Sequence, residues 1–238
     1  MFVFTLPIVC FGNITSITAD YLLGDAFIIK KTPQLFRAKL EEDGKIETEF
    51  PYTLATPKDS FLEITFHEIE NISRTLRIGR GSALEIKNEY QFYMFKGTFL
   101  HASRDQSKTI IESNQSRVTL EGSGTFIAET TPIGFKIIIL EGDFETYGTT
   151  SSKTITSGEL ALITDSSGKI SDPMQIELLL LLNTSRLITQ FPKLLPTHTR
   201  LLSAAKVQSM RMKTKYDAFI GGVSENEQLR IWKVGRPE

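Results

Sequence analysis

Two similar passages of this sequence carry glycines at matching positions, and these glycines constrain the fold more than any other feature. The passages cover residues 80–99 and 121–144. Each has a Gly-Ser pair, a short strand-like run, an apolar run, and then a charged residue, a glycine, a polar residue and phenylalanine. The later glycines, Gly97 and Gly142, are 45 positions apart. A repeat of this size predicts stacked β units, so we expect a mostly β, solenoid-like stack.

Six glycines fall where the predicted strands end or turn. Glycine adopts backbone angles that other residues avoid, which makes it a usual residue of tight turns. We therefore expect these glycines to shape turns and to take no part in chemistry. They are Gly81, Gly97, Gly122, Gly124, Gly142 and Gly158.

Composition excludes several classes of function. Of the 238 residues, 40% are hydrophobic and 23% are charged, which is typical of a globular protein. The formal net charge of −1 lacks the positive excess that nucleic-acid binding usually requires. Cys10 is the single cysteine, so the sequence predicts no disulfide within the chain and no cysteine-based zinc site. We expect no nucleic-acid partner, no metal and no cofactor.

The amino-terminal residues 1–11 form an apolar run that is too short to cross a bilayer as a helix. They fit the hydrophobic part of a secretory signal, and residues 16–19 supply small side chains before a cleavage site ahead of Asp20. We expect residues 1–19 to be a signal peptide and the protein to be exported to the periplasm or beyond. The alternative is a buried first strand. No later segment has the pattern of a transmembrane span.

The hydrophobic pattern divides the remaining chain into two parts. Residues 20–170 contain short alternating runs separated by turn residues, which predicts a β domain. Within it, residues 135–140 are nearly all apolar, as expected for a strand covered on both faces. Residues 171–238 change to a helical pattern, which predicts a carboxy-terminal appendage on the β domain.

Helix signals define this appendage. Asp172 followed by Pro173 is a strong helix start, and Pro192 should end that helix. We expect a second helix over residues 199–213 and an alternating strand over residues 228–234. The residues of the second helix that we expect to face inward are Leu201, Leu202, Ala205 and Met212.

Three short segments resemble the FecR-like domain. They are Gly124 to Ala128, Ile138 to Glu145 and Ile155 to Leu160. In that family a strand starts with Gly-Thr, an apolar strand ends in Glu-Gly, and a later turn contains Gly-Glu or Gly-Gln. The resemblance covers roughly residues 54–165 and implies a β domain on the envelope side of the cytoplasmic membrane. The sigma-binding segment and transmembrane helix of the family's iron-responsive regulators have no counterpart here, so the resemblance implies this domain alone.

Motifs of known enzymes are incomplete in this chain. His67-Glu68 begins like a zinc protease motif but lacks the second histidine. The run Gly79 to Leu84 begins like a nucleotide-binding loop, but the third glycine is missing and we interpret it as a turn. Glu121 and Glu141 could approach each other as a glycosidase pair would. Both precede a glycine at matching repeat positions, so turn formation explains them, and we expect no catalytic residues.

One aromatic strand is the better candidate for a binding surface. Tyr90, Phe92, Tyr93 and Phe95 are close together in the sequence. Strand alternation would place Phe92 with Met94 on one face, and Tyr93 with Phe95 on the other. Such a strand is either fully buried or presents a platform for a sugar or a peptide.

The leading hypothesis is an exported, non-catalytic interaction module of the bacterial cell envelope, which signals or scaffolds by binding a protein partner. The exposed edge of the stack could pair with a strand of that partner. The second hypothesis is a protein that binds a carbohydrate or surface polymer through the aromatic strand. The third is an enzyme acting on polysaccharides, which would need two carboxylates in an open groove.

Overall fold

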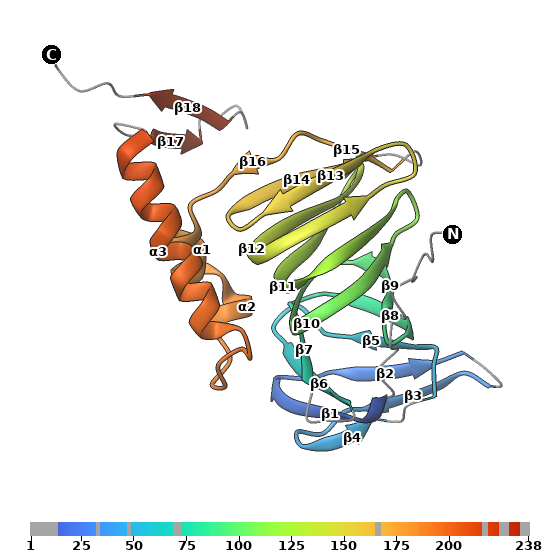
Figure 1. The fold of residues 1–238 in the computed structure, drawn as a ribbon. Helices are drawn as coiled ribbons and strands as arrows, with labels where there is room; N and C mark the ends of the chain where they lie inside the picture. Colours follow the sequence, from blue (N-terminus) through green and yellow to red (C-terminus); the bar gives the residue numbers. More distant parts are fainter. Residues whose placement is uncertain are drawn as a thin grey trace, which may run out of the picture.

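The fold is mostly β with a helical carboxy-terminal segment, as the sequence predicted (Figure 1). The computed structural model describes residues 14–31, 34–46, 49–68, 73–164, 168–215, 219–223 and 229–233. Within these ranges, one open sheet of 16 strands carries the three helices on one side, and a separate two-stranded sheet ends the chain. The solenoid-like repetition expected from the sequence stays a prediction.

The first strands are β1 (Ile14–Leu23), β2 (Phe27–Lys30), β3 (Phe36–Lys39), β4 (Gly44–Ile46), β5 (Tyr52–Ala55), β6 (Phe61–Glu68), β7 (Ser73–Ile78), β8 (Ala83–Asn88) and β9 (Gln91–Lys96). The later strands of the large sheet are β10 (Thr98–Glu112), β11 (Arg117–Thr131), β12 (Gly134–Tyr147), β13 (Ser152–Thr156), β14 (Glu159–Thr164), β15 (Lys169–Ile170) and β16 (Met174–Gln175). The helices are α1 (Leu178–Thr184), α2 (Arg186–Thr189) and α3 (His198–Lys215), and the last hairpin is β17 (Phe219–Val223) with β18 (Leu229–Lys233).

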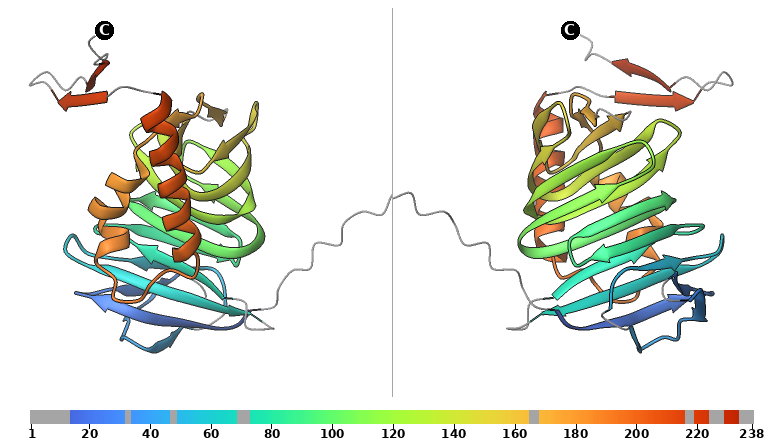
Figure 2. Two further views of the ribbon diagram at one scale, coloured as in Figure 1. Left: turned by 60° about the vertical axis from the view of Figure 1, so that its left-hand side comes forward. Right: turned by 90° about the vertical axis from the view of Figure 1, so that its right-hand side faces the viewer.

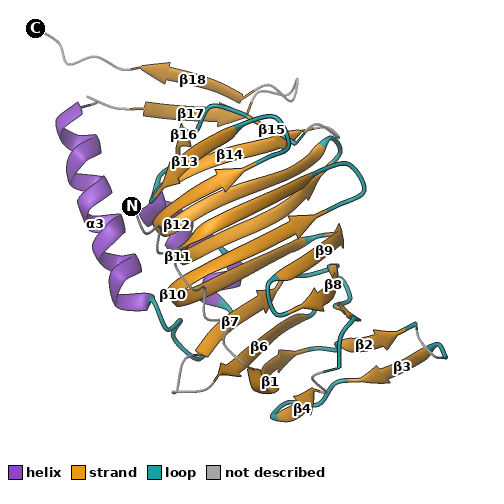
Figure 3. Ribbon diagram, turned by 45° about the vertical axis from the view of Figure 1, so that its right-hand side comes forward, coloured by secondary structure: helices purple, strands orange, loops and turns teal. Residues whose placement is uncertain are grey.

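The three longest strands, β10, β11 and β12, lie side by side in the sheet (Figure 3). The two halves of β10 and of β12 pair with different strands, so that the sheet folds into two layers. The first part of β10 pairs with β7, whereas its last part pairs with β9. Likewise the first part of β12 pairs with β14 and its last part with β13. We call the layer with β1, β6, β7 and β14 the helix-facing layer, and the layer with β2, β5, β8, β9 and β13 the open layer.

The main core lies between these layers. Phe92 of the open layer contacts Phe99 of the helix-facing layer, with ring centroids 5.6 Å apart. Phe126 and Phe144 make the same kind of contact across the layers at 5.6 Å. Because alternate side chains point to opposite faces of a strand, the remaining side chains of the helix-facing layer are free to pack under the helices.

The apolar run at residues 135–140 is covered on both faces, and this prediction is confirmed. Phe135, Ile137 and Ile139 point into the core between the layers. Ile138 and Leu140 belong to a second apolar cluster with residues of the helices. Burial on both faces explains why this strand carries no alternating polar residues.

The bends are made by glycines inside strands, which corrects the prediction that Gly122, Gly124 and Gly142 lie in turns. Gly124 and Gly142 face each other directly on β11 and β12. Gly142 has a φ of +90°, and a Cβ there would lie 2.0 Å from the carbonyl oxygen of Ser123. Gly122 would also meet the neighbouring backbone, at 2.5 Å from the carbonyl oxygen of Asp143. These positions need glycine because two backbones approach closely at the bend.

The matching glycine of the first passage lies at the opposite end of the layer. Gly97 connects β9 to β10, and its N–H donates to the hydroxyl of Thr130, near the end of β11. Gly142 instead lies beside Gly124, in the middle of β11. The two similar passages therefore form bends at the two edges of the folded sheet. Gly81 and Gly158 lie in the turns that lead to β8 and β14.

The helical segment begins later than predicted. Residues 174–175 form β16 against β14, and α1 starts at Leu178. The side chain of Asp172 forms an ion pair with Lys153 and caps no helix. The second predicted helix is confirmed as α3, in which Leu201 and Ala205 are buried. Leu202 is 49% exposed, so its inward orientation was wrong, and the side chain of Met212 lies outside the described residues.

The helices cover the outer face of the helix-facing layer (Figure 2). Leu178, Leu182 and Leu201 pack there against apolar side chains of β10, β11 and β12. Gln208 of α3 is almost fully buried, and its amide accepts from the N–H of Leu178 and donates to the carbonyl oxygen of Ile176. This one side chain therefore joins α3 to the start of α1.

Residues at the end of the predicted signal peptide belong to the sheet. Ile17 and Ala19 of β1 have no exposed surface and lie opposite Phe66 and Ile64 of β6. Cleavage ahead of Asp20 would remove these core contacts, because the first part of β1 lies before that position. Residues 1–13 lie outside the described part of the chain.

Replacing Gly142 by alanine should destabilise the protein by about 3 kcal/mol or more, because the added Cβ meets backbone at a positive φ. Gly81 is the matched control, since its φ is +61° but the nearest atom to an added Cβ, in Lys58, is 4.0 Å away. Gly81→Ala should cost only about 1 kcal/mol. Urea denaturation of both variants measures the difference, and equal losses would contradict the close approach at the bend.

A chain that starts at Asp20 should be about 3 kcal/mol less stable than the full chain, because buried Ile17 and Ala19 are removed. Thermal and urea denaturation of the two chains test this. Equal stability would restore a cleavage site ahead of Asp20.

Candidate functional site

The aromatic strand predicted as a binding surface is β9 with the turn before it. Phe92 has no exposed surface and Met94 is 2% exposed, so both point into the core. Phe92 is therefore removed from the candidate surface, because its ring packs between the layers. Tyr93 is half-buried and Phe95 is 41% exposed on the outer face of the open layer. The alternation that the sequence predicted is present.

The exposed rings already have partners. Tyr93 and Phe95 lie edge to face with centroids 4.8 Å apart. The ammonium group of Lys87 lies 5.1 Å from the ring of Tyr93, and that of Lys31 lies 5.2 Å from the ring of Phe95. The guanidinium group of the buried Arg74 lies 4.3 Å from the ring centroid of Tyr90. A ligand that stacks on these rings would have to share them with the lysines, which makes this surface a weaker candidate.

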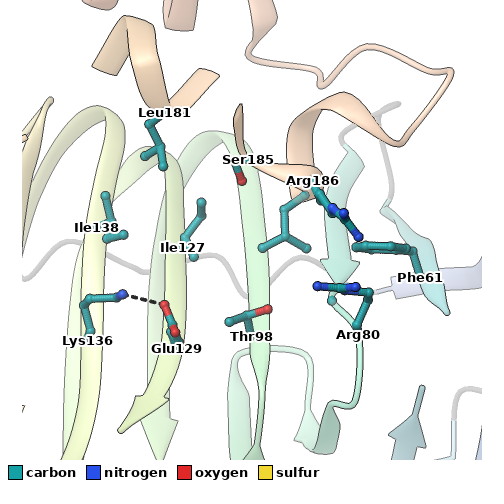
Figure 4. Close-up of a pocket in the computed structure, with 12 residues that line it drawn as sticks. Phe61, Arg80, Thr98, Ile127, Glu129, Lys136, Ile138, Leu181, Ser185 and Arg186 are labelled. Atoms are coloured by element: carbon teal, nitrogen blue, oxygen red, sulfur yellow. Dashed lines mark ion pairs between the residues drawn. The ribbon is translucent and has the colours of Figure 1, made fainter. Parts of the chain in front are cut away.

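A pocket on the other side of the molecule has a different character. It has a volume of about 420 Å³ and lies between the outer face of the helix-facing layer and the segment that joins α1 to α2 (Figure 4). Ile127, Ile138, Leu181 and Leu187 supply apolar surface. The other lining residues are Phe61, Gly79, Arg80, Thr98, Glu129, Lys136, Ser185 and Arg186.

The wall of the pocket depends on a close contact at Gly79. A Cβ at this position would lie 2.3 Å from the hydroxyl oxygen of Thr98 and 3.5 Å from a methyl group of Leu187. A side chain here would therefore clash with Thr98 of the neighbouring strand, whereas its contact with Leu187 of α2 would be an ordinary one. The sequence predicted a turn in this run, and residues 80–81 form a turn that leads into β8.

A buried ion pair positions the roof of the pocket. Arg77 of β7 and Glu63 of β6 both point away from the core, and their side chains are each only 1% exposed. The Nε of Arg77 donates to the carboxylate of Glu63 at 2.6 Å. Other guanidinium N–H groups of Arg77 donate to the carbonyl oxygens of Leu187, at 3.2 Å, and of Lys193. Arg77 of the sheet thus binds the backbone of the helical segment at two points, Leu187 and Lys193.

Burial controls the electrostatics of this anchor. Removal of water lowers the pKa of the Arg77 guanidinium, and the charge of Glu63 opposes that shift. The guanidinium also lies 4.4 Å from the ring centroid of Phe191. A paired and hydrogen-bonded charge can stay buried, whereas removal of one partner leaves the other without compensation.

The pocket carries an excess of positive charge. Glu129 and Lys136 form an ion pair at 2.5 Å and neutralise each other. Arg80 and Arg186 are exposed, and among the residues that the structure describes neither has an ion-pair partner. In Figure 4 both side chains lie at the same end of the pocket as Phe61. Two such groups at one end of an apolar pocket favour an anionic group, which arginine binds in a bidentate manner.

The pocket residues come from distant parts of the chain, and the sequence did not identify them as a set. They lie on β6, β10, β11, β12, α1 and α2 and on the loop after β7. The single available signal was Arg80, in the run from Gly79 to Leu84 that we interpreted as a turn. No spacing rule connects that arginine with Arg186, more than a hundred positions later.

The carboxylates considered for catalysis have separate partners. Glu121 forms an ion pair with Lys108 at 2.8 Å, and Glu141 forms one with Arg200 of α3 at 2.9 Å. Burial raises the pKa of Glu141, and the charge of Arg200 opposes that shift. The parts of the chain that the structure describes contain no group of three His, Cys, Asp or Glu residues placed to hold a metal ion. None of their helices combines the length and hydropathy needed to cross a membrane.

Comparison with known proteins gives only distant similarities. No family model matches the chain, and no curated protein matches it. Two crystal structures from Parabacteroides distasonis, each provisionally described as an anti-sigma factor, are similar in structure. The first has a TM-score of 0.41 and 10% identity and covers 78% of this chain and 100% of its own. The second has a TM-score of 0.39 and 10% identity, with coverages of 77% and 99%. At TM-scores this low, neither match supports an inference about this chain.

Replacing Arg77 by methionine should destabilise the protein by about 3–5 kcal/mol, because Glu63 is left buried without its partner. It should also release the roof of the pocket, which hydrogen exchange of residues 178–190 would detect. Arg74→Met is the matched control, because Arg74 is also buried and paired, with Glu68, but faces the space between the layers. Both variants should unfold more easily in urea, and only Arg77→Met should speed exchange in the roof. Equal exchange in both would contradict the anchoring role.

Proposed function

We propose that this chain is a non-catalytic interaction module of the bacterial cell envelope that binds a protein partner through the pocket beneath α1 and α2. The observation that carries the proposal is the pair Arg80 and Arg186, two arginines without ion-pair partners in the described part of the chain, beside apolar surface. A pocket with this charge can hold a ligand, and its one carboxylate, Glu129, is neutralised by Lys136. Binding is therefore the activity that the pocket supports best.

The cellular setting of the proposal comes from the sequence. The resemblance of residues 54–165 to the FecR-like domain supports an envelope location, a role in signalling or scaffolding, and a solenoid-like interpretation of the β layers. The apolar run at residues 1–11 supports export, because it fits the hydrophobic part of a secretory signal.

A second candidate function is the binding of a glycan at the outer face of the open layer. The observation that favours it is the exposed pair of rings, Tyr93 and Phe95. Sugars stack on such rings, but the lysines beside them compete for the same contacts. A glycan array with the wild type and with Tyr93→Ala separates this candidate from peptide binding, since the pocket lies on the other layer.

The main proposal predicts selection of specific peptides. A display library of random short peptides, panned against the folded protein, should yield sequences that bind the wild type. Their binding should fall at least about tenfold in the double variant Arg80→Ser/Arg186→Ser, because two charged hydrogen-bond donors are lost. Biolayer interferometry with the selected peptides gives the affinities.

The control for this experiment removes the same charge elsewhere. Arg37 lies over the ring of Phe27, and Arg117 is paired with Glu112; both lie outside the pocket. The variant Arg37→Ser/Arg117→Ser should bind the selected peptides like the wild type. If no peptide is enriched, or if both double variants bind equally, the pocket is not the binding site and the proposal fails.

A further inference from the structure

The pocket is elongated across the sheet, and its direction defines the shape of a ligand. Its lining comes in order from β6, the loop after β7, β10, β11 and β12. The strands β6, β7, β10, β11 and β12 are consecutive neighbours in the helix-facing layer. Neighbouring strands are about 4.8 Å apart, so the four intervals give a length of about 19 Å. An extended peptide of about six residues has this length, at about 3.3 Å per residue.

The charge is concentrated at one end of this groove. The guanidinium groups of Arg80 and Arg186 lie beside Phe61 at the β6 end (Figure 4). At the β12 end, Lys136 and Glu129 neutralise each other. A ligand with one acidic side chain would therefore be oriented with that side chain at the β6 end, because the other end attracts no net charge.

The apolar part of the groove lies at a defined distance from the arginines. Ile127 of β11 lines it on the side of the sheet, and Leu181 of α1 lines it on the side of the roof. Phe61, beside which the two guanidinium groups lie, is on β6, and β6 is three strand intervals or about 14 Å from β11. Two side chains on the same face of an extended peptide and four residues apart are separated by about 13 Å. The hydroxyls of Thr98 and Ser185 lie between, where they can bond to the peptide backbone.

We propose that the groove binds an extended segment of about six residues with an acidic residue and an apolar residue four positions apart. The acidic side chain binds between Arg80 and Arg186, and the apolar side chain packs on Ile127 and Leu181. This inference rests on the proposed function and specifies the chemistry of the partner. It differs from addition of a strand to a sheet edge, because the segment crosses the strands instead of extending the sheet.

The test uses short peptides of defined sequence. One probe is a capped hexapeptide with glutamate first, leucine fifth and serine elsewhere, and a second has the two residues exchanged. A third replaces glutamate by glutamine, and a fourth replaces leucine by serine. Methyl NMR of the full chain with labelled isoleucine and leucine, at millimolar peptide, should show shifts at Ile127, Ile138 and Leu181 with one of the first two probes. The glutamine and serine probes should bind at least about tenfold more weakly.

Variants of the protein complete the test. Arg80→Ser and Arg186→Ser should each raise the Kd of the glutamate probe about tenfold, and Leu181→Ser should weaken the leucine contact while leaving the glutamine penalty unchanged. Arg117→Ser, on the open layer, should have no effect. The proposal is overturned if the glutamine probe binds equally well, if the shifts lie outside the groove, or if neither glutamate probe binds at millimolar concentration. It is also overturned if inorganic phosphate binds at the arginines while no probe does.

Failure of this inference can be told apart from failure of the proposed function. If the display library yields peptides whose binding requires Arg80 and Arg186 but lacks the acidic and apolar pair, the interaction module stands and the specific ligand is wrong. If neither the library nor the probes yield binding at the pocket, both are wrong.

Discussion

The close approach of two backbones at Gly124 and Gly142 is the constraint on which the remaining structure depends. It lets β11 and β12 bend without breaking, so that one sheet supplies both layers of the core. A residue with a Cβ would hold the strands apart at this point. Without the bend, the aromatic contacts between layers, such as Phe126 with Phe144, could not form.

The bend also frees the outer face of the helix-facing layer for a second use. Ile127, Ile138 and Leu140 point outward there and need a cover, which the helices provide. Arg77 and Gln208 fix that cover by binding backbone groups of the helical segment. The pocket exists where this cover leaves part of the sheet open, so the anchors that stabilise the fold also shape the candidate site.

The charge of the pocket separates it from the aromatic surface as a site of binding. Tyr93 and Phe95 interact with each other and with lysines, so a ligand would compete with these contacts for the rings. Arg80 and Arg186 have no ion-pair partner among the described residues. Exposed charges in water cost little, but a carboxylate bound between them and shielded from water gains more than the same contact on an open surface.

The sequence by itself determined the local features: the β pattern, the strand at residues 135–140 that is buried on both faces, the alternation of β9 and the helix α3. These follow from periodicity, which each segment carries alone. It did not determine where α1 begins, because Met174 and Gln175 pair with β14, or that Leu202 would face solvent. Only the tertiary structure decided that the matching glycines lie at opposite edges of the folded sheet, Gly97 between two strands and Gly142 inside one. It also decided that Arg80 and Arg186 share a pocket, since contacts between distant segments depend on how strands pair, and no local pattern encodes that.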